Sequence, residues 1–218
     1  MSKTPAESLQ VYRRDQIVSA ARDVIGENGY EQSSVDQIAR RAGLSRSTVY
    51  EYFSSKEEIL KGSFAAHREE LAEALTRSIR RVRGIEAQLT AFFEICLSRV
   101  DQNREFFLAI SFPLPLDEAA AAEGPGGTEF ALVIKHFNDA VDRILVEGFE
   151  RGELPRPVSP ADRTCLGTLV VGAMGARCRL EAPPAVEASA AEFAGFALRG
   201  LGPAADPDPR HPKEAGRG

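Results

Sequence analysis

The side chains best suited to chemistry in this sequence are short hydroxyls, phenols and cations gathered between positions 34 and 56. They are Ser34, Arg46, Ser47, Thr48, Tyr50, Tyr52 and Lys56. Arginine binds guanine edges or phosphate, threonine contacts a base or a thymine methyl group, and tyrosine and lysine suit phosphate oxygens. The chemistry indicated is recognition of double-stranded DNA, without the making or breaking of bonds.

Motifs for catalysis or for a metal site do not accompany this set. The sequence has no phosphate-binding glycine loop, no G-x-S-x-G and no H-E-x-x-H motif. His67 and Glu70, like His136 and Asp139, share a helical face and form a possible metal pair, but exposed polar faces explain both pairs more simply. We expect no enzyme activity, no catalytic residue, no metal and no cofactor.

Two short helices separated by a glycine must position the predicted DNA-binding side chains. Ser33 and Ser34 precede a helical apolar pattern that begins at Val35, and each serine has a possible capping partner three residues on. Gly43 ends this helix, because a sharp reversal favours a residue without a Cβ atom. Ser45 then caps a second short helix. The spacing predicts a helix-turn-helix.

Helical periodicity gives the second short helix an inner and an outer face. Val49 and Phe53 turn inward, and the small Ala39 allows the two helices to cross closely. The predicted DNA-binding side chains of this helix then face outward, towards a major groove. Tyr50 and Tyr52 have a second interpretation as partial core residues. Either Ser54 or Ser55 caps the longer helix that follows.

Four short motifs follow one another in the order typical of one protein family. They are Ile38-Ala39, Ala42-Gly43-Leu44-Ser45, Thr48-Val49-Tyr50-Glu51-Tyr52-Phe53 and Ser55-Lys56-Glu57-Glu58-Ile59. Over about residues 13–64 the sequence resembles the TetR family of bacterial transcriptional regulators. Ser47 departs from the glycine that the family often has before the threonine, so the operator sequence cannot be carried over. The resemblance implies a dimer that binds operator DNA.

The rest of the chain has a helical period and no alternating strand pattern of useful length. Helices are predicted over about 128–151, 160–181 and 184–201, whereas prolines and glycines in 111–128 predict an irregular loop or a broken helix. The fold class is therefore all-α, with an N-terminal three-helix helix-turn-helix domain joined to a larger helical ligand-binding and dimerisation domain. The predicted divisions are a disordered segment 1–10, a DNA-binding domain 11–57, an effector-binding and dimerisation domain 58–201, and a disordered tail 202–218.

Composition restricts how such a protein binds DNA. The formal net charge is −5, which argues against coating nucleic acid through bulk electrostatics. DNA binding must depend on locally placed cations, and salt should weaken it. The sequence lacks the apolar core of a signal peptide and the roughly 20 apolar residues of a membrane span. We therefore expect a cytoplasmic protein, with reduced cysteines and no membrane partner.

Two further sets of residues are interpreted through the family resemblance. The middle helices are expected to enclose a cavity for a small effector, although aromatic residues at helical spacing are more often simply core. Its candidate lining residues are Phe92, Phe93, Phe106, Phe107, Phe137 and Met174, and Phe112 is a further candidate. Small residues in the last two helices predict either a four-helix dimer interface or close packing within one subunit. The candidates are Gly172, Gly175, Ala176, Phe193, Phe196 and Ala197.

The sequence thus predicts a sequence-specific DNA-binding transcriptional regulator, a repressor released from its operator by a small, largely apolar effector. Its expected partners are operator DNA, a second copy of the chain and that effector. The alternatives are a regulator that activates or acts without an effector and, with less support, a helical protein-interaction module.

Overall fold

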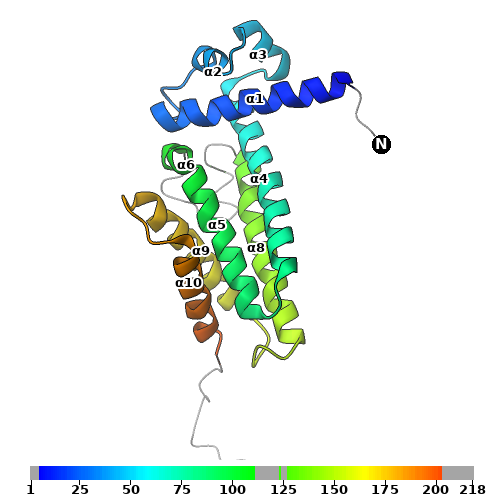
Figure 1. Ribbon diagram of the computed structural model, residues 1–218, viewed down its shortest axis with the longest axis vertical. Helices are drawn as coiled ribbons and strands as arrows, with labels where there is room; N and C mark the ends of the chain where they lie inside the picture. Colours follow the sequence, from blue (N-terminus) through cyan, green and yellow to red (C-terminus); the bar gives the residue numbers. More distant parts are fainter. Residues whose placement is uncertain (1–4, 111–122, 124–126, 203–218) are drawn as a thin grey trace, which may run out of the picture.

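The computed structural model describes residues 5–110, 123 and 127–202, and within them every regular element is a helix (Figure 1). The helices are α1 (Pro5–Asn28), α2 (Val35–Arg41), α3 (Arg46–Tyr52), α4 (Lys56–Arg81), α5 (Ile85–Gln102), α6 (Arg104–Ile110), α8 (Gly127–Glu150), α9 (Pro160–Arg179) and α10 (Val186–Gly200). The predicted all-α fold is confirmed. Phe112, most of the predicted irregular segment and almost all of the predicted tail lie outside the described residues.

The predicted helix boundaries around the turn follow from local capping. Ser34 is the N-cap of α2, and its side chain and that of Gln37 form a reciprocal capping box. Ser45 caps α3 by accepting a hydrogen bond from the backbone N–H of Thr48. Gly43 adopts a φ of +66°, a left-handed conformation that glycine tolerates best. Ordinary local preferences therefore suffice to build the helix-turn-helix.

The structure also resolves the two capping alternatives. Ser33 is buried and donates its hydroxyl to the carbonyl groups of Val24 and Gly29, so it fastens α2 to the end of α1. Ser55, whose side chain accepts a hydrogen bond from the backbone N–H of Glu58, is the N-cap of α4. Ser54 instead donates from its backbone and its hydroxyl to the carboxylate of Glu58.

Helix α1 begins at Pro5, earlier than the sequence pattern placed it, so residues 5–10 are helical. Proline is tolerated in a first helical turn, and an acidic residue, Glu7, lies in that turn. Residues 7–12 are exposed, including Leu9 and Tyr12. Since this part of α1 buries no stripe of side chains, it has no apolar period to reveal it.

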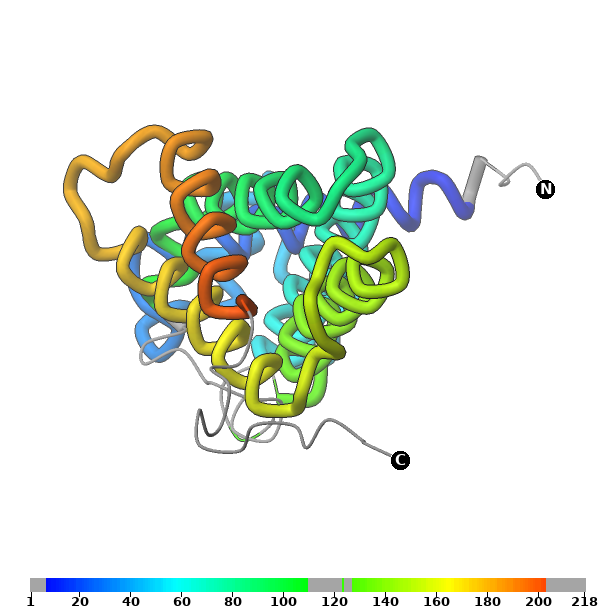
Figure 2. The backbone as a smooth tube through the Cα atoms, turned by 90° about the horizontal axis from the view of Figure 1, so that it is seen from below, coloured from blue at the N-terminus to red at the C-terminus, as the bar shows by residue number. Residues whose placement is uncertain are grey.

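The helical body is arranged around α5, which contacts α4, α8, α9 and α10. Seen from below, α9 and α10 lie on one side of the body and α4 and α8 on the other (Figure 2). Helix α1 runs across the upper end of the body and packs on α4 and α6 (Figure 1). The N-terminal helices are thus joined to the body both by the continuous helix α4 and by the contact between α1 and α6.

None of the described helices combines the length and the apolar character that a membrane crossing requires.

Candidate nucleic-acid interface and internal cavity

Helix α3 presents one buried face and one exposed face, as the periodicity predicts. Val49 is fully buried, and Phe53, which follows the helix, is 1% exposed. Arg46, Ser47 and Tyr50 are exposed, whereas Thr48 and Tyr52 are partly buried. Ser34 is exposed at the start of α2. The exposed face offers a guanidinium, hydroxyls and a phenol, which are groups that contact bases and phosphates in a major groove.

The guanidinium of Arg46 is held by neighbours on both short helices. It donates to the Asp36 carboxylate of α2 over 3.0 Å and to the Tyr50 hydroxyl over 3.3 Å. The hydrogen bond with Tyr50, followed by the charge of Asp36, raises the pKa of Arg46. All these groups are exposed, so DNA can replace them as partners.

The hydroxyl of Ser45 gathers the short polar side chains at the start of α3. Its Oγ lies 2.8 Å from Ser47 Oγ and 2.8 Å from Thr48 Oγ1, and it also accepts from the Thr48 backbone N–H. The two predicted base-contacting hydroxyls are therefore held close to the helix cap. Rotation about χ1 releases either hydroxyl towards a ligand.

Lys56 holds the turn between α1 and α2 together. Its ammonium group donates to the carbonyl oxygens of Tyr30 (2.7 Å) and Ser33 (3.1 Å), with a longer contact to that of Glu31 (3.4 Å). It also lies 4.3 Å from the centre of the Tyr30 ring, a favourable cation–π position. The sequence pattern suggested a phosphate ligand, whereas the structure places this charge against backbone carbonyls of its own chain.

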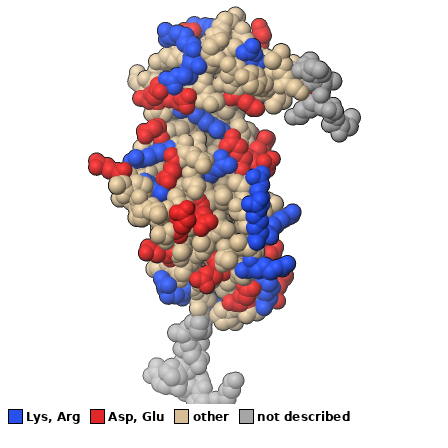
Figure 3. Space-filling model, viewed as in Figure 1, with Lys and Arg blue, Asp and Glu red and all other residues tan. Residues whose placement is uncertain are grey.

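Arg14 of α1 packs against the end of α3. It donates to the carbonyl oxygen of Tyr52 over 3.1 Å, and its guanidinium lies 4.1 Å from the centre of the Phe53 ring. Arg41 forms ion pairs with Glu27 and Asp23 of α1. Arg40, in contrast, is exposed and forms no ion pair with a described residue. Basic and acidic side chains are interspersed at this end of the molecule (Figure 3).

The helical body contains a cavity of about 610 Å³ between α4, α6, α8 and α9. Of the predicted lining residues, Phe107, Phe137 and Met174 contribute to its wall. The other three, Phe92, Phe93 and Phe106, do not line the cavity and are buried in the aromatic core. Ring centres lie 5.6 Å apart between Phe92 and Phe93, 5.6 Å between Phe93 and Phe193, and 5.9 Å between Phe106 and Phe64.

His67 borders the cavity, although the sequence pattern placed it on an exposed polar face. It lines the cavity and is only 3% exposed, and the neighbouring Glu70 is engaged by arginine side chains. The helical spacing of Leu60, Phe64, His67 and Leu71, all buried, was the available signal for an inward position. The other proposed metal pair involves His136, whose Nδ1 lies 3.0 Å from the carbonyl oxygen of Leu132. Among the described residues, no cluster of three His, Cys, Asp or Glu side chains is placed to hold a metal ion.

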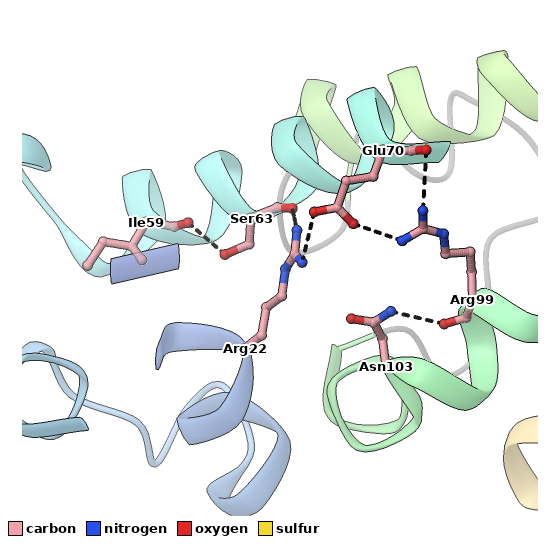
Figure 4. A network of polar contacts seen from close by, with 6 residues as sticks. All are labelled: Arg22, Ile59, Ser63, Glu70, Arg99 and Asn103. Atoms are coloured by element: carbon pink, nitrogen blue, oxygen red, sulfur yellow. Dashed lines mark hydrogen bonds and ion pairs between the residues drawn. The ribbon is translucent and has the colours of Figure 1, made fainter. Parts of the chain in front are cut away.

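A polar network joins the DNA-binding end to the body beside this cavity (Figure 4). Arg22 of α1 donates to the carbonyl oxygen of Ser63 over 3.0 Å and lies 3.6 Å from the Glu70 carboxylate. Glu70 also accepts a 2.9 Å hydrogen bond from Arg99 of α5. Burial is the largest influence on Arg22 and lowers its pKa. Three helices are therefore tied together by one carboxylate.

The last two helices divide the predicted interface residues between two faces. Gly172, Ala176 and Phe196 face outward, and Phe196 is 62% exposed. Three others face the body: Gly175 and Ala197 are buried, and Phe193 packs on Phe93.

The fold and the exposed helix-turn-helix together define a class of protein, the DNA-binding transcriptional regulators. Residues 17–62 match the family model described as bacterial regulatory proteins of the tetR family. The fatty acid metabolism regulator protein of Bacillus subtilis (strain 168) is 32% identical over 139 residues, which cover 64% of this chain and 69% of the relative. The HTH-type transcriptional regulator SrpR of Pseudomonas putida is 28% identical over 153 residues, covering 70% of this chain and 68% of the relative.

Solved structures share the fold of this chain. FadR from Bacillus subtilis, in complex with stearoyl-CoA, has a TM-score of 0.72 and 23% identity, with coverage of 85% of this chain and 98% of that one. FadR from Bacillus halodurans has a TM-score of 0.69 and 22% identity, with coverage of 91% and 97%. The chain belongs to the TetR family and is a DNA-binding transcriptional regulator.

Proposed function

We propose that this protein is a homodimeric repressor that leaves its operator when a small, largely apolar molecule occupies the cavity between α4, α6, α8 and α9. The observation that carries the proposal is the cavity itself. Its inner wall consists mainly of buried apolar side chains, and exposed polar residues such as Asp139 and Thr168 lie at its rim. A largely apolar site with a few polar groups suits an apolar ligand.

The likeness to fatty acid regulators supports a ligand that contains an acyl chain. FadR from Bacillus subtilis was solved in complex with stearoyl-CoA, and the curated relative from that species is named as a regulator of fatty acid metabolism. In this chain, an acyl chain would lie among the phenylalanine and valine side chains of α6 and α8. The ion pair between Arg163 and Asp142 at the rim is placed to contact a polar head group.

Helix α6 provides the connection between the cavity and the DNA-binding end. Phe107 lines the cavity, while the preceding Phe106 packs against Phe64 of α4. The N-terminal part of α6 touches α1 so closely that a Cβ atom on Gly26 would lie 2.9 Å from Glu105 Cβ. A ligand that displaces Phe107 would therefore shift α1 as well, because packed interfaces change between discrete arrangements and do not deform smoothly.

We assign DNA binding to residues 11–57, and effector binding and dimerisation to residues 58–201. Within the first unit, the proposed contacts are made by Arg46 and by the hydroxyl and phenol groups predicted from the sequence. Since α3 has only seven residues, it spans few base pairs. Specific binding therefore needs two copies of α3, about 34–36 Å apart on consecutive turns of the duplex.

The exposed face of α9 supports a dimer built on the last two helices. Away from the cavity, one exposed stripe of this helix consists of small residues, with Arg179 in the last turn: Ala161, Cys165, Gly172 and Ala176. Phe196 of α10 adds a large exposed aromatic side chain. Small residues allow a second helix to approach closely, and a two-fold axis would bring the same face of a second copy against this one.

The operator and its release are tested together. Selection from random duplexes should yield a palindromic site, and an acyl compound should weaken binding to it in a mobility-shift assay. Met174→Trp, which fills part of the cavity, should remove the response to the compound, whereas Val146→Trp on the exposed face of α8 should retain it. Lack of any preference over random duplex would contradict the DNA half of the proposal. An equal ligand response in the Met174→Trp protein would contradict the cavity half.

The dimer is tested by sedimentation. Ala176→Arg should give a monomer with little operator affinity, because the charge would be buried without a partner at the proposed interface. Thr76→Arg, an exposed change on α4, should remain a dimer. A dimeric Ala176→Arg protein with normal operator binding would refute the assigned interface.

A further inference from the structure

His67 is a buried polar side chain whose Nε2 atom has no hydrogen-bond partner among the described residues. It lies on α4 at the cavity wall, is 3% exposed, and its Nε2 atom is buried without a hydrogen-bond partner. Its ring packs edge-on against Phe107, with ring centres 5.3 Å apart. Buried polar groups are nearly always paired, so an unpaired one that faces a cavity indicates a missing partner.

The polar groups of the cavity fall into two separate regions. At the rim, Asn138, Asp139 and Thr168 are exposed and meet solvent. At the inner end, the described part of the chain places His67 among buried apolar side chains such as Phe130 and Ile134. A plain hydrocarbon chain that filled this end would bury the imidazole permanently without a partner, which is unfavourable.

The surrounding charges favour an electron-rich partner. Burial, followed by the charges of Arg22 and Arg99, lowers the pKa of His67 to about 3. The imidazole is therefore neutral at pH 7 and can donate one hydrogen bond. Two guanidiniums and a single carboxylate, that of Glu70, form the nearby network, so the net local charge is positive. A ligand oxygen is attracted by this potential, and a ligand N–H or O–H hydrogen is repelled.

We infer that His67 selects ligands that carry a hydrogen-bond-accepting oxygen, of a carbonyl or a carboxylate, at the end that lies deepest in the cavity. This inference rests on the proposed effector site and narrows its ligand class. His67 is a specificity-determining residue: it discriminates between an apolar molecule with an oxygen at the buried end and one of the same shape without it.

The test uses the full-length protein and a matched pair of ligands. The pair is 2-undecanone and 2-methylundec-1-ene, in which a methylene group replaces the carbonyl oxygen. Affinities are measured by displacement of an environment-sensitive apolar fluorophore. The wild type should bind the ketone about tenfold more tightly than the alkene, as one neutral hydrogen bond in a buried site contributes. Undecanoate forms a second arm that distinguishes carboxylates from neutral carbonyls.

Variants assign the discrimination to the imidazole. In His67→Leu the ketone and the alkene should bind equally, whereas Val146→Leu, a change on the exposed face of α8 outside the cavity wall, should keep the tenfold preference. His67→Gln retains an N–H donor and should keep part of the preference for the ketone. If the leucine variant does not fold, the glutamine variant and the ¹⁵N chemical shift of His67 Nε2 in the wild type still test the inference. Ketone binding must move that chemical shift, and alkene binding must not.

The outcomes separate this inference from the function on which it rests. Equal affinities for ketone and alkene in the wild type, or a preference that survives in His67→Leu, would overturn the role of His67 and leave the apolar effector site standing. If no probe binds the wild type, both the proposed effector site and this inference are overturned. A His67-dependent preference for the ketone, for undecanoate or for both supports the inference and identifies the oxygen source.

Discussion

Replacing Lys56 with methionine should destabilise the folded protein without changing the number of phosphates that it neutralises on DNA. Methionine keeps an unbranched apolar stem but removes the ammonium group, which donates to the carbonyl oxygens of Tyr30, Glu31 and Ser33. These carbonyls follow the last turn of α1 and precede α2. The substitution therefore weakens the corner that holds the helix-turn-helix against α1.

The size of the effect follows from the contacts. A hydrogen bond from a charged donor contributes about 1.5–3 kcal/mol to stability. Lys56 is partly exposed and one of its three contacts is long, at 3.4 Å, so the whole cluster should be worth little more than one such bond. We expect a loss of about 2 kcal/mol in the free energy of unfolding. For a chain of this size, that corresponds to a melting temperature lower by about 4–8 °C.

Urea denaturation at a fixed protomer concentration measures the stability, and the salt dependence of operator binding measures the phosphate contacts. Lys61→Met is the matched control, because Lys61 lies five residues further along α4 and pairs, within the described part of the chain, with the exposed Glu57. Its stability should be unchanged. A Lys56→Met protein of normal stability whose salt slope falls by about 0.9 per protomer would refute this reasoning and make Lys56 a phosphate ligand.

Three other substitutions test separate parts of the structure. His67 has a pKa of about 3 when folded and about 6.5 when unfolded, so the unfolded chain binds more protons between these values and wild-type stability should fall as pH drops from 6.5. At pH 5 this loss in the free energy of unfolding is about 2 kcal/mol, and His67→Leu should abolish it. Identical pH profiles of the wild type and the variant in urea titrations would contradict the assignment. Gly26→Ala should destabilise the protein by about 1–2 kcal/mol, although alanine favours helices, because its Cβ would meet the backbone of α6. A higher urea midpoint for the variant would argue against that close contact. Arg46→Ala should weaken operator binding 10- to 100-fold at an unchanged melting temperature. Fluorescence anisotropy measures both affinities, and an equal loss of affinity for random DNA would make Arg46 a phosphate contact only.

The helix-turn-helix was predictable because its signals are local. Ser34, Ser45 and Ser55 each cap a helix within three residues of their own position, and the left-handed turn at Gly43 needs only that residue. The inward face of α3 likewise follows from a period of 3.6 residues. Only the start of α1 escaped this reasoning, since its exposed first turns bury no apolar stripe.

The cavity was less predictable because the same residue types line it and fill the core. Phe92 and Phe107 are equally aromatic and both buried, yet only Phe107 borders the cavity. Periodicity identifies which residues face inward but not which of them meet empty space. That distinction depends on how the four helices around the cavity cross, and no local spacing encodes it.

By itself, the sequence determined the class of fold, the family and the residues of the DNA-binding motif, because caps, turns and amphipathic periods act over a few residues. Only the tertiary structure decided which groups lie beside Lys56 and His67. The partners of Lys56 lie 23 to 26 residues away along the chain, and the groups around His67 come from other helices, among them Phe107 of α6 and Arg99 of α5. A cation or an imidazole has many possible uses, and the partners that folding places beside it select one of them.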